Sequence, residues 1–121
     1  MSESYDTGKQ GEQAAADYLS SNGYNIIDRN WHCGKYEIDI ICKRQDEIIF
    51  VEVKSHHKSN IFDIKLLVNK EKRRKIIYSA DKYVRIKNIK LNARFDIIVV
   101  IYNASDYVIE HIPNAFYYSR Y

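Results

Sequence analysis

The chain has 121 residues, 45% of them hydrophobic and 29% charged, which predicts one globular domain over residues 1–121 and excludes disordered and low-complexity classes. No apolar run approaches the roughly 20 residues of a membrane span, and the first ten residues are polar, so we expect a cytoplasmic protein that does not enter membranes. The net charge of +3 is unevenly distributed, because residues 54–90 contain 12 Lys/Arg and 3 Asp/Glu. This segment favours nucleic-acid binding, although a basic helix that is merely solvated would have the same composition.

The N-terminal quarter predicts a helix and then a short strand. The helix covers residues 8–22, with Thr7 as its N-cap and Asn22-Gly23 as its end, because glycine adopts the left-handed conformation at little cost. Its inward stripe consists of small and apolar residues and also carries Glu12, a carboxylate that the first turn of a helix tolerates. Residues 24–30 follow as the first strand.

The next two strands form a hairpin. Residues 36–43 and 48–54 are rich in β-branched side chains, and a polar turn over residues 44–47 joins them. If the turn is centred between Gln45 and Asp46, residues that face each other have numbers adding up to 91. One face of this hairpin is then wholly apolar, and we expect it to be the core. It consists of Ile38, Ile40, Cys42, Ile49, Val51 and Val53.

The second half of the chain predicts a loop, a helix and two strands. The loop covers residues 55–65 and the helix residues 69–85. Residues 94–102 form a buried strand, and residues 107–112 form a last strand that Pro113 stops. The order of these elements predicts an α/β fold in which helices flank a central mixed sheet. The apolar face of the second helix consists of Ile76, Ile77, Ala80, Tyr83 and Val84.

The hairpin register places two carboxylates opposite each other. Asp39 faces Glu52 with the Cβ atoms about 4.5–5.5 Å apart, and like charges at such positions are destabilising. A divalent cation would compensate, and carboxylate oxygens suit Mg²⁺ or Mn²⁺ better than zinc. Lys54 lies on the same face, where it can orient water or offset phosphate charge. The alternative is an ordinary ion-pair cluster with Glu37 facing Lys54, and a β-bulge would break the register.

A known family shares these residues. Asp39, followed in the next strand by Glu52-Val53-Lys54, resembles the PD-(D/E)XK nuclease signature. The wider series is similar to the YraN-like family of predicted endonucleases, distantly related to archaeal Holliday-junction resolvases. The series comprises Gly8-x-x-Gly11-Glu12, Ala15, Tyr18-Leu19, Gly23-Tyr24, Asn30-Trp31, Glu37-Ile38-Asp39, Phe50-Val51-Glu52-Val53-Lys54, Lys72 with Ala80, Arg94-Phe95-Asp96, and His111 with Asn114-Ala115-Phe116.

This resemblance implies a restriction-endonuclease-like fold and metal-dependent hydrolysis of DNA with Mg²⁺ or Mn²⁺. The chain departs from the family pattern at Lys35-Tyr36, where two glycines usually precede Glu-Ile-Asp, and at Ser55-His56, where an arginine often follows the lysine. The implied roles are metal ligands at Asp39, Glu52 and the Val53 carbonyl, catalysis by Lys54, and an additional acid at Glu12.

Basic residues beyond the hairpin predict a surface for DNA, branched or single-stranded. Lys72 falls on the inward stripe of its helix and reaches either phosphate or, as a snorkelling side chain, solvent. Trp31 and the tyrosines could stack on unpaired bases. The Tyr117-Tyr118 tail could pack on a partner subunit, which leaves a homodimer open. The candidate nucleic-acid contacts are Lys72, Arg73, Arg74, Lys75, His56 and Lys58.

Three functions stay open at this point. The first is a metal-dependent endonuclease that hydrolyses DNA at branches or flaps. The second is a nucleic-acid-binding module of the same fold with little catalytic activity, and the third is a protein-interaction adaptor. Intact Asp39, Glu52 and Lys54 favour the first, and the basic run over residues 72–75 favours the first two over the third.

Overall fold

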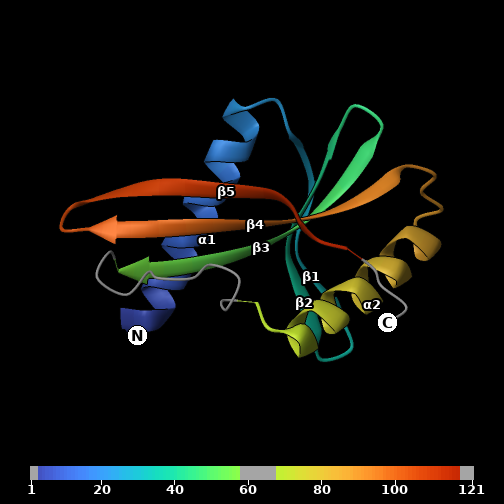
Figure 1. The fold of residues 1–121 in the computed structure, drawn as a ribbon, viewed down its shortest axis with the longest axis horizontal. Coiled ribbons are helices and arrows are strands. Elements are labelled where there is room, and N and C mark those ends of the chain that lie inside the picture. The colour runs from blue at the N-terminus through green and yellow to red at the C-terminus, as the bar shows by residue number, and fades with distance from the viewer. Residues whose placement is uncertain (1–2, 58–67, 118–121) are drawn as a thin grey trace.

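A central sheet of five strands organises the chain, in the spatial order β1-β2-β3-β4-β5. The computed structural model describes residues 3–57 and 68–117. β3 and β4 run parallel and all other neighbours are antiparallel, so the predicted mixed sheet flanked by helices is confirmed (Figure 1). The elements are α1 (Glu3–Ser21), β1 (Asn25–Cys33), β2 (Tyr36–Arg44), β3 (Glu47–His57), α2 (Lys70–Ile86), β4 (Asn92–Asn103) and β5 (Asp106–Phe116).

The helix α1 covers one face of the sheet. Its inward stripe packs against residues of β2, β3 and β4, as predicted. Gly11 is buried at this interface, where a Cβ atom would collide with the Ser55 hydroxyl, so glycine lets α1 lie close to β3. The predicted cap at Thr7 is wrong, because nothing in residues 3–6 breaks a helix and α1 begins at Glu3. Gly23 ends the helix region with a φ of 85°, as expected.

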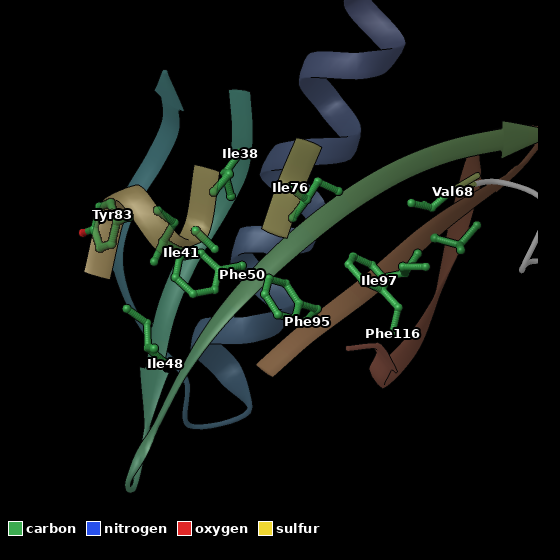
Figure 2. Close-up of a cluster of buried hydrophobic side chains, with 12 residues drawn as sticks. Ile38, Ile41, Ile48, Phe50, Val68, Ile76, Tyr83, Phe95, Ile97 and Phe116 are labelled. Atoms are coloured by element: carbon green, nitrogen blue, oxygen red, sulfur yellow. The ribbon is translucent and has the colours of Figure 1, made fainter. Parts of the chain in front are cut away.

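The helix α2 covers the other face of the sheet, and the cluster beneath it is drawn in Figure 2. Ile41, Ile48 and Phe50 from the hairpin are fully buried there. The expectation of a single core face is therefore wrong: both faces of the hairpin are buried, because each has its own helix. Ile38 also joins the α2 side, although the alternation predicted it beside Ile40 on the other face.

The predicted hairpin register is confirmed from the turn as far as Ile40, which pairs with Val51. There the two strands part. β2 continues beside β1 alone, whereas β3 continues beside β4 alone, and Figure 1 shows the two groups of strands diverging. The expected backbone pairing of Asp39 with Glu52 is therefore wrong. The Asp39 carboxylate accepts a hydrogen bond from the Val53 N–H instead, at 2.8 Å.

Several element boundaries differ from the sequence predictions, and β1 and β4 are both longer than expected. Residues 55–57 lie in β3, paired with β4, and not in a loop; residues 58–65 of that loop lie outside the described residues. The helix α2 begins after Asn69, whose side chain caps the Lys72 N–H. The strand β5 passes through Pro113, because β5 is an edge strand and a register shift there accommodates the missing N–H. Neither described helix has the length and hydropathy that crossing a bilayer requires.

Candidate metal centre

Four carboxylates gather where β2 and β3 part, and together they form the acidic centre. They are Glu12 from α1, Glu37 and Asp39 from β2, and Glu52 from β3. Oxygens of Glu12, Glu37 and Asp39 lie within 4.8 Å of one another. Glu52 interacts directly with Asp39 and is only 5% exposed. Because the two strands part here, a side chain from α1 can join those of β2 and β3 in one centre.

Asn30 holds two of these carboxylates together. Its amide nitrogen donates to Glu12 at 2.7 Å and to Glu37 at 2.9 Å. Asn30 has a φ of 50°, a conformation that asparagine adopts more readily than most residues, and it lies between the β1 residues that pair with Ile38 and Ile40. The residue was noticed in the sequence only within the family series. Asn30 is the last residue of the predicted strand, where an asparagine is not unusual, so no local signal singled it out.

Asp39 is half-buried, and its negative charge is poorly compensated. Burial, the negative charge of Glu52 and a hydrogen bond with Glu52 raise the pKa of Asp39 to about 8, although the Val53 N–H acts in the opposite direction. Without an added cation, the protonated form of this carboxyl is therefore favoured at neutral pH. A divalent cation between the two groups would reverse that preference, because it stabilises ionised ligands.

Two lysines approach the same carboxylate from different elements. Lys54 Nζ lies 3.5 Å and Lys72 Nζ 3.7 Å from Glu52 Oε2. The predicted inward position of Lys72 at the site is confirmed. The alternative of a Glu37–Lys54 ion pair has no support, because Glu37 contacts Asn30 and pairs with His32 at 3.1 Å.

An open groove of about 590 Å³ borders the acidic centre beside α1. It gives an extended ligand access to the carboxylates, and its walls carry both negative and positive side chains. Arg29 is held on this wall by its hydrogen bond to Gln13, at 3.1 Å. The lining residues are Gly8, Lys9, Glu12, Gln13, Arg29, Asn30 and Glu37.

The donor set of the acidic centre fits a hard divalent cation. All its candidate ligands are carboxylate oxygens, with the Val53 backbone beside Asp39, and such oxygens suit Mg²⁺ or Mn²⁺. Cys33 and Cys42 are free thiols, and neither belongs to this cluster. The sequence-predicted residues Asp39, Glu52 and Lys54 thus lie together, and the structure adds Glu37 to them.

The predicted nucleic-acid residues occupy different settings. Arg73 donates from Nε to the Val68 carbonyl at 2.8 Å and lies over the Phe116 ring, so it fastens the start of α2 to the core. Arg74 is exposed, and Lys75 is half exposed. His56 is half-buried on β3, and Lys58 lies outside the described residues. Their contacts with nucleic acid remain predictions.

A second polar cluster lies on the α1 side of β4, around the fully buried Asp96. Arg94 donates to both of its oxygens, at 2.9 and 2.8 Å, and the Asn114 N–H donates at 2.9 Å. His111 Nε2 lies 2.7 Å away, and its Nδ1 is hydrogen-bonded to the Tyr18 hydroxyl at 3.0 Å. Burial alone would raise the pKa of Asp96, but the hydrogen bonds from His111, Arg94 and Asn114 outweigh it and lower that pKa.

Comparison with known proteins places these residues in a family context. The family described as "Uncharacterised protein family UPF0102" matches residues 11–100. Over 117 residues and 97% of both chains, the chain is 42% identical to a UPF0102 protein of Parabacteroides distasonis and 43% identical to one of Phocaeicola vulgatus. A UPF0102 protein of Flavobacterium psychrophilum is 34% identical over 118 residues, covering 98% of this chain and 99% of its own. These matches confirm the resemblance to the YraN-like family.

Proposed function

The chain belongs to the UPF0102 family, and we propose that it is a metal-dependent endonuclease that hydrolyses phosphodiester bonds in DNA. One observation carries this proposal: Glu12, Glu37, Asp39 and Glu52 converge at the parting of β2 and β3, beside Lys54. Gathering like charges in a largely buried place is costly unless a cation joins them. The open groove beside α1 supports a polymeric rather than a small substrate.

The residues of the site have complementary tasks in this reaction. A bound Mg²⁺ or Mn²⁺ supplies positive charge that polarises the phosphate and favours deprotonation of water. Asp39, Glu52 and the Val53 carbonyl would hold the cation, and Glu12, which Asn30 links to Glu37, would support it. Lys54 orients the attacking water or offsets charge on the phosphate. The water oxygen bonds to phosphorus as the bond from phosphorus to the leaving oxygen breaks, and the leaving oxygen takes up a proton.

Cleavage assays test the proposal directly. Branched, flapped, single-stranded and duplex DNAs are incubated with the protein in Mg²⁺ or Mn²⁺ and, separately, in chelator. We expect cation-dependent cleavage of at least one DNA, its loss in Asp39→Asn and Lys54→Ala, and its retention in the matched surface controls Glu110→Gln and Lys90→Ala. Metal binding should weaken in Asp39→Asn but survive in Lys54→Ala, because a neutral amide is a poorer ligand. Equal cleavage by wild type and Asp39→Asn would contradict the proposal.

A nucleic-acid-binding module with little activity is the second candidate. It is favoured by the two ammonium groups that pair with Glu52, because they compete with a cation for that carboxylate. If this candidate is correct, the protein binds DNA but cuts none of the DNAs in the panel. Its affinity for DNA should fall steeply as the salt concentration rises, because binding to phosphates releases counterions. Arg74→Ala should weaken this binding, because Arg74 is the exposed arginine of the basic run on α2.

A further inference from the structure

We propose that an exposed patch on α2 and β2 binds an unpaired nucleic-acid strand and leads it to the acidic centre. The patch consists of Tyr36, Lys75, Tyr78 and Lys82, and we call it the tyrosine–lysine patch. Its assignment as a substrate path rests on the proposed function, whereas strand binding itself requires no cleavage. The proposal names the substrate class as DNA with a single-stranded extension.

The two rings and two ammonium groups of the patch alternate. The rings of Tyr36 and Tyr78 meet edge to face, with centroids 6.1 Å apart and an interplanar angle of 86°. Lys75 Nζ lies 5.6 Å from the Tyr36 centroid, and Lys82 Nζ lies 5.4 Å from the Tyr78 centroid. Aromatic rings interleaved with positive charges are the combination that single-strand binders use, because rings stack on bases while cations bind phosphates.

The patch is accessible, and Tyr78 adds little to the core. Tyr78 is 52% exposed and the Lys75 side chain is 42% exposed. Contacts between an exposed lysine and a ring are worth only about 0.5–1 kcal/mol. Base–aromatic stacking is worth about 1–3 kcal/mol per base. An incoming base can therefore displace each lysine from its ring, and the freed ammonium group can then bind the adjacent phosphate.

The patch is continuous with the acidic centre along α2. Lys72, Lys75, Tyr78 and Lys82 are three or four residues apart, which places them on one side of the helix. Lys72 Nζ lies 3.7 Å from Glu52, so this row begins at the centre itself. With a rise of about 1.5 Å per residue the row spans about 15 Å.

The charge around the patch favours an anionic partner. The helix α2 carries seven Lys/Arg and two acidic residues over Lys70–Ile86. Glu71 pairs with Lys75 at 3.4 Å, but Glu71 is 77% exposed, and such exposed pairs contribute little and are screened by salt. Bases within a duplex stack on each other and offer no free faces, so the rings select unpaired strands.

Binding measurements in chelator test this inference without cleavage. Three fluorescent DNAs of equal length are compared by anisotropy: an oligothymidine, a strand with the same phosphates but no bases in the contacted segment, and a blunt duplex. The double variant Tyr36→Ala/Tyr78→Ala should bind oligothymidine about tenfold or more weakly. Its affinity for the base-free strand and for the duplex should stay near that of wild type. Tyr36→Phe/Tyr78→Phe should bind like wild type, because stacking needs only the rings.

Tyr107 provides the matched control. Tyr107 is 43% exposed on β5, and its ring also lies 6.1 Å from another tyrosine ring, that of Tyr102. Tyr107→Ala should leave all three affinities unchanged. Lys75→Gln/Lys82→Gln should instead weaken binding of both single strands, with and without bases, and reduce the salt dependence of binding. Thermal melts check that every variant is folded.

The results separate this inference from the proposed function. If oligothymidine binds the Tyr→Ala variant as well as wild type, or if its binding falls no more than that of the base-free strand, the stacking role is wrong. An equal loss for the duplex would make the patch a duplex surface and would also overturn the inference. Cleavage of any DNA in Mg²⁺ would still support the nuclease proposal in either case. Intact single-strand binding with no cleavage would overturn only the nuclease proposal.

Discussion

Two aspartates of the same sheet, Asp96 fully buried and Asp39 half-buried, face opposite environments. Asp96 on β4 receives hydrogen bonds from Arg94 and the Asn114 N–H and contacts His111, and its pKa is lowered. Asp39 on β2 receives one backbone hydrogen bond and faces the carboxylate of Glu52, and its pKa is raised to about 8. Both are acidic residues within largely apolar strands, and their partners distinguish them.

The difference in partners shows how the surroundings of a carboxylate indicate its role. A carboxylate whose lone pairs are matched by cations and N–H groups stabilises the fold, so Asp96 ties β4 to β5. A carboxylate surrounded by other carboxylates destabilises the fold until a cation arrives, which is the arrangement expected of a preorganised binding site. Four predictions, from the largest expected effect to the smallest, test this comparison.

Removing each negative charge should have opposite consequences for stability. Asp96→Asn leaves the Arg94 guanidinium without its buried partner, so we expect a loss of about 3–5 kcal/mol in the free energy of unfolding. Asp39→Asn replaces a carboxyl that is costly to place beside Glu52, whether it ionises or takes up a proton on folding, with a neutral amide, so in chelator it should be neutral or stabilising. Urea unfolding at neutral pH measures both. Equal destabilisation by the two changes would show that Asp39 is as well compensated as Asp96.

The two aspartates should also give opposite pH dependence. Asp39 has a higher pKa in the folded protein, about 8, than its ordinary 3.8, so the folded state binds the proton more tightly. In chelator, this group should therefore lower stability as the pH rises from about 4 to about 8, by at most about 1.4 kcal/mol per pH unit. Asp39→Asn should remove that slope, as urea unfolding at several pH values would reveal.

The Asp96 carboxylate should instead change the free energy of unfolding at acidic pH. Its folded pKa lies below the ordinary value of 3.8, so its contribution is present at neutral pH and is lost as the pH falls through the folded pKa. A slope between pH 4 and 8 that persists in Asp39→Asn would assign that slope to another group.

Cations should stabilise only the acidic centre. At Mg²⁺ or Mn²⁺ concentrations ten times the dissociation constant, binding adds about 1.4 kcal/mol to the free energy of unfolding. We expect a melting temperature several degrees higher for wild type and for the control Glu110→Gln, and no shift for Asp39→Asn. If the cation also shifts the melt of Asp39→Asn, the cation binds elsewhere.

The smallest expected effect lies at the periphery of the Asp96 cluster. Tyr18→Phe removes the hydroxyl that is hydrogen-bonded to His111 Nδ1, so we expect a loss of about 1 kcal/mol in the free energy of unfolding. Chemical denaturation checks this value, and any cleavage activity should be unchanged because Tyr18 lies outside the acidic centre. A loss as large as that of Asp96→Asn would mean that His111 depends on Tyr18 to hold its ring beside Asp96.

Local sequence patterns predicted much of the architecture. The alternating strands with a polar turn predicted the hairpin register as far as Ile40 and Val51. The spacing of apolar residues in α2 also predicted the inward position of Lys72. Both predictions depend on interactions within one element or between neighbouring elements, where side-chain period and turn length leave few alternatives.

The sequence predictions were wrong where strand boundaries and buried faces depend on elements distant in the chain. Pro113 stops a strand by local rules, but the edge position of β5 leaves its missing N–H harmless. The strand β3 extends to His57 because β4 supplies parallel partners that no local pattern announces. The second buried face of the hairpin likewise required α2, which returns from far along the chain to cover it.

The sequence by itself determined which residues are candidates for the proposed chemistry: Asp39, Glu52 and Lys54 follow from strand periodicity, turn length and a family pattern. Only the tertiary structure decided how they meet. β2 and β3 part after Ile40, so Asp39 accepts from the Val53 N–H and does not face Glu52 in the strand register, and Asn30 draws Glu12 and Glu37 into the opening. The physical reason is that strand pairing is set by short-range hydrogen bonds, whereas the parting of strands depends on helices and neighbouring strands distant in the chain.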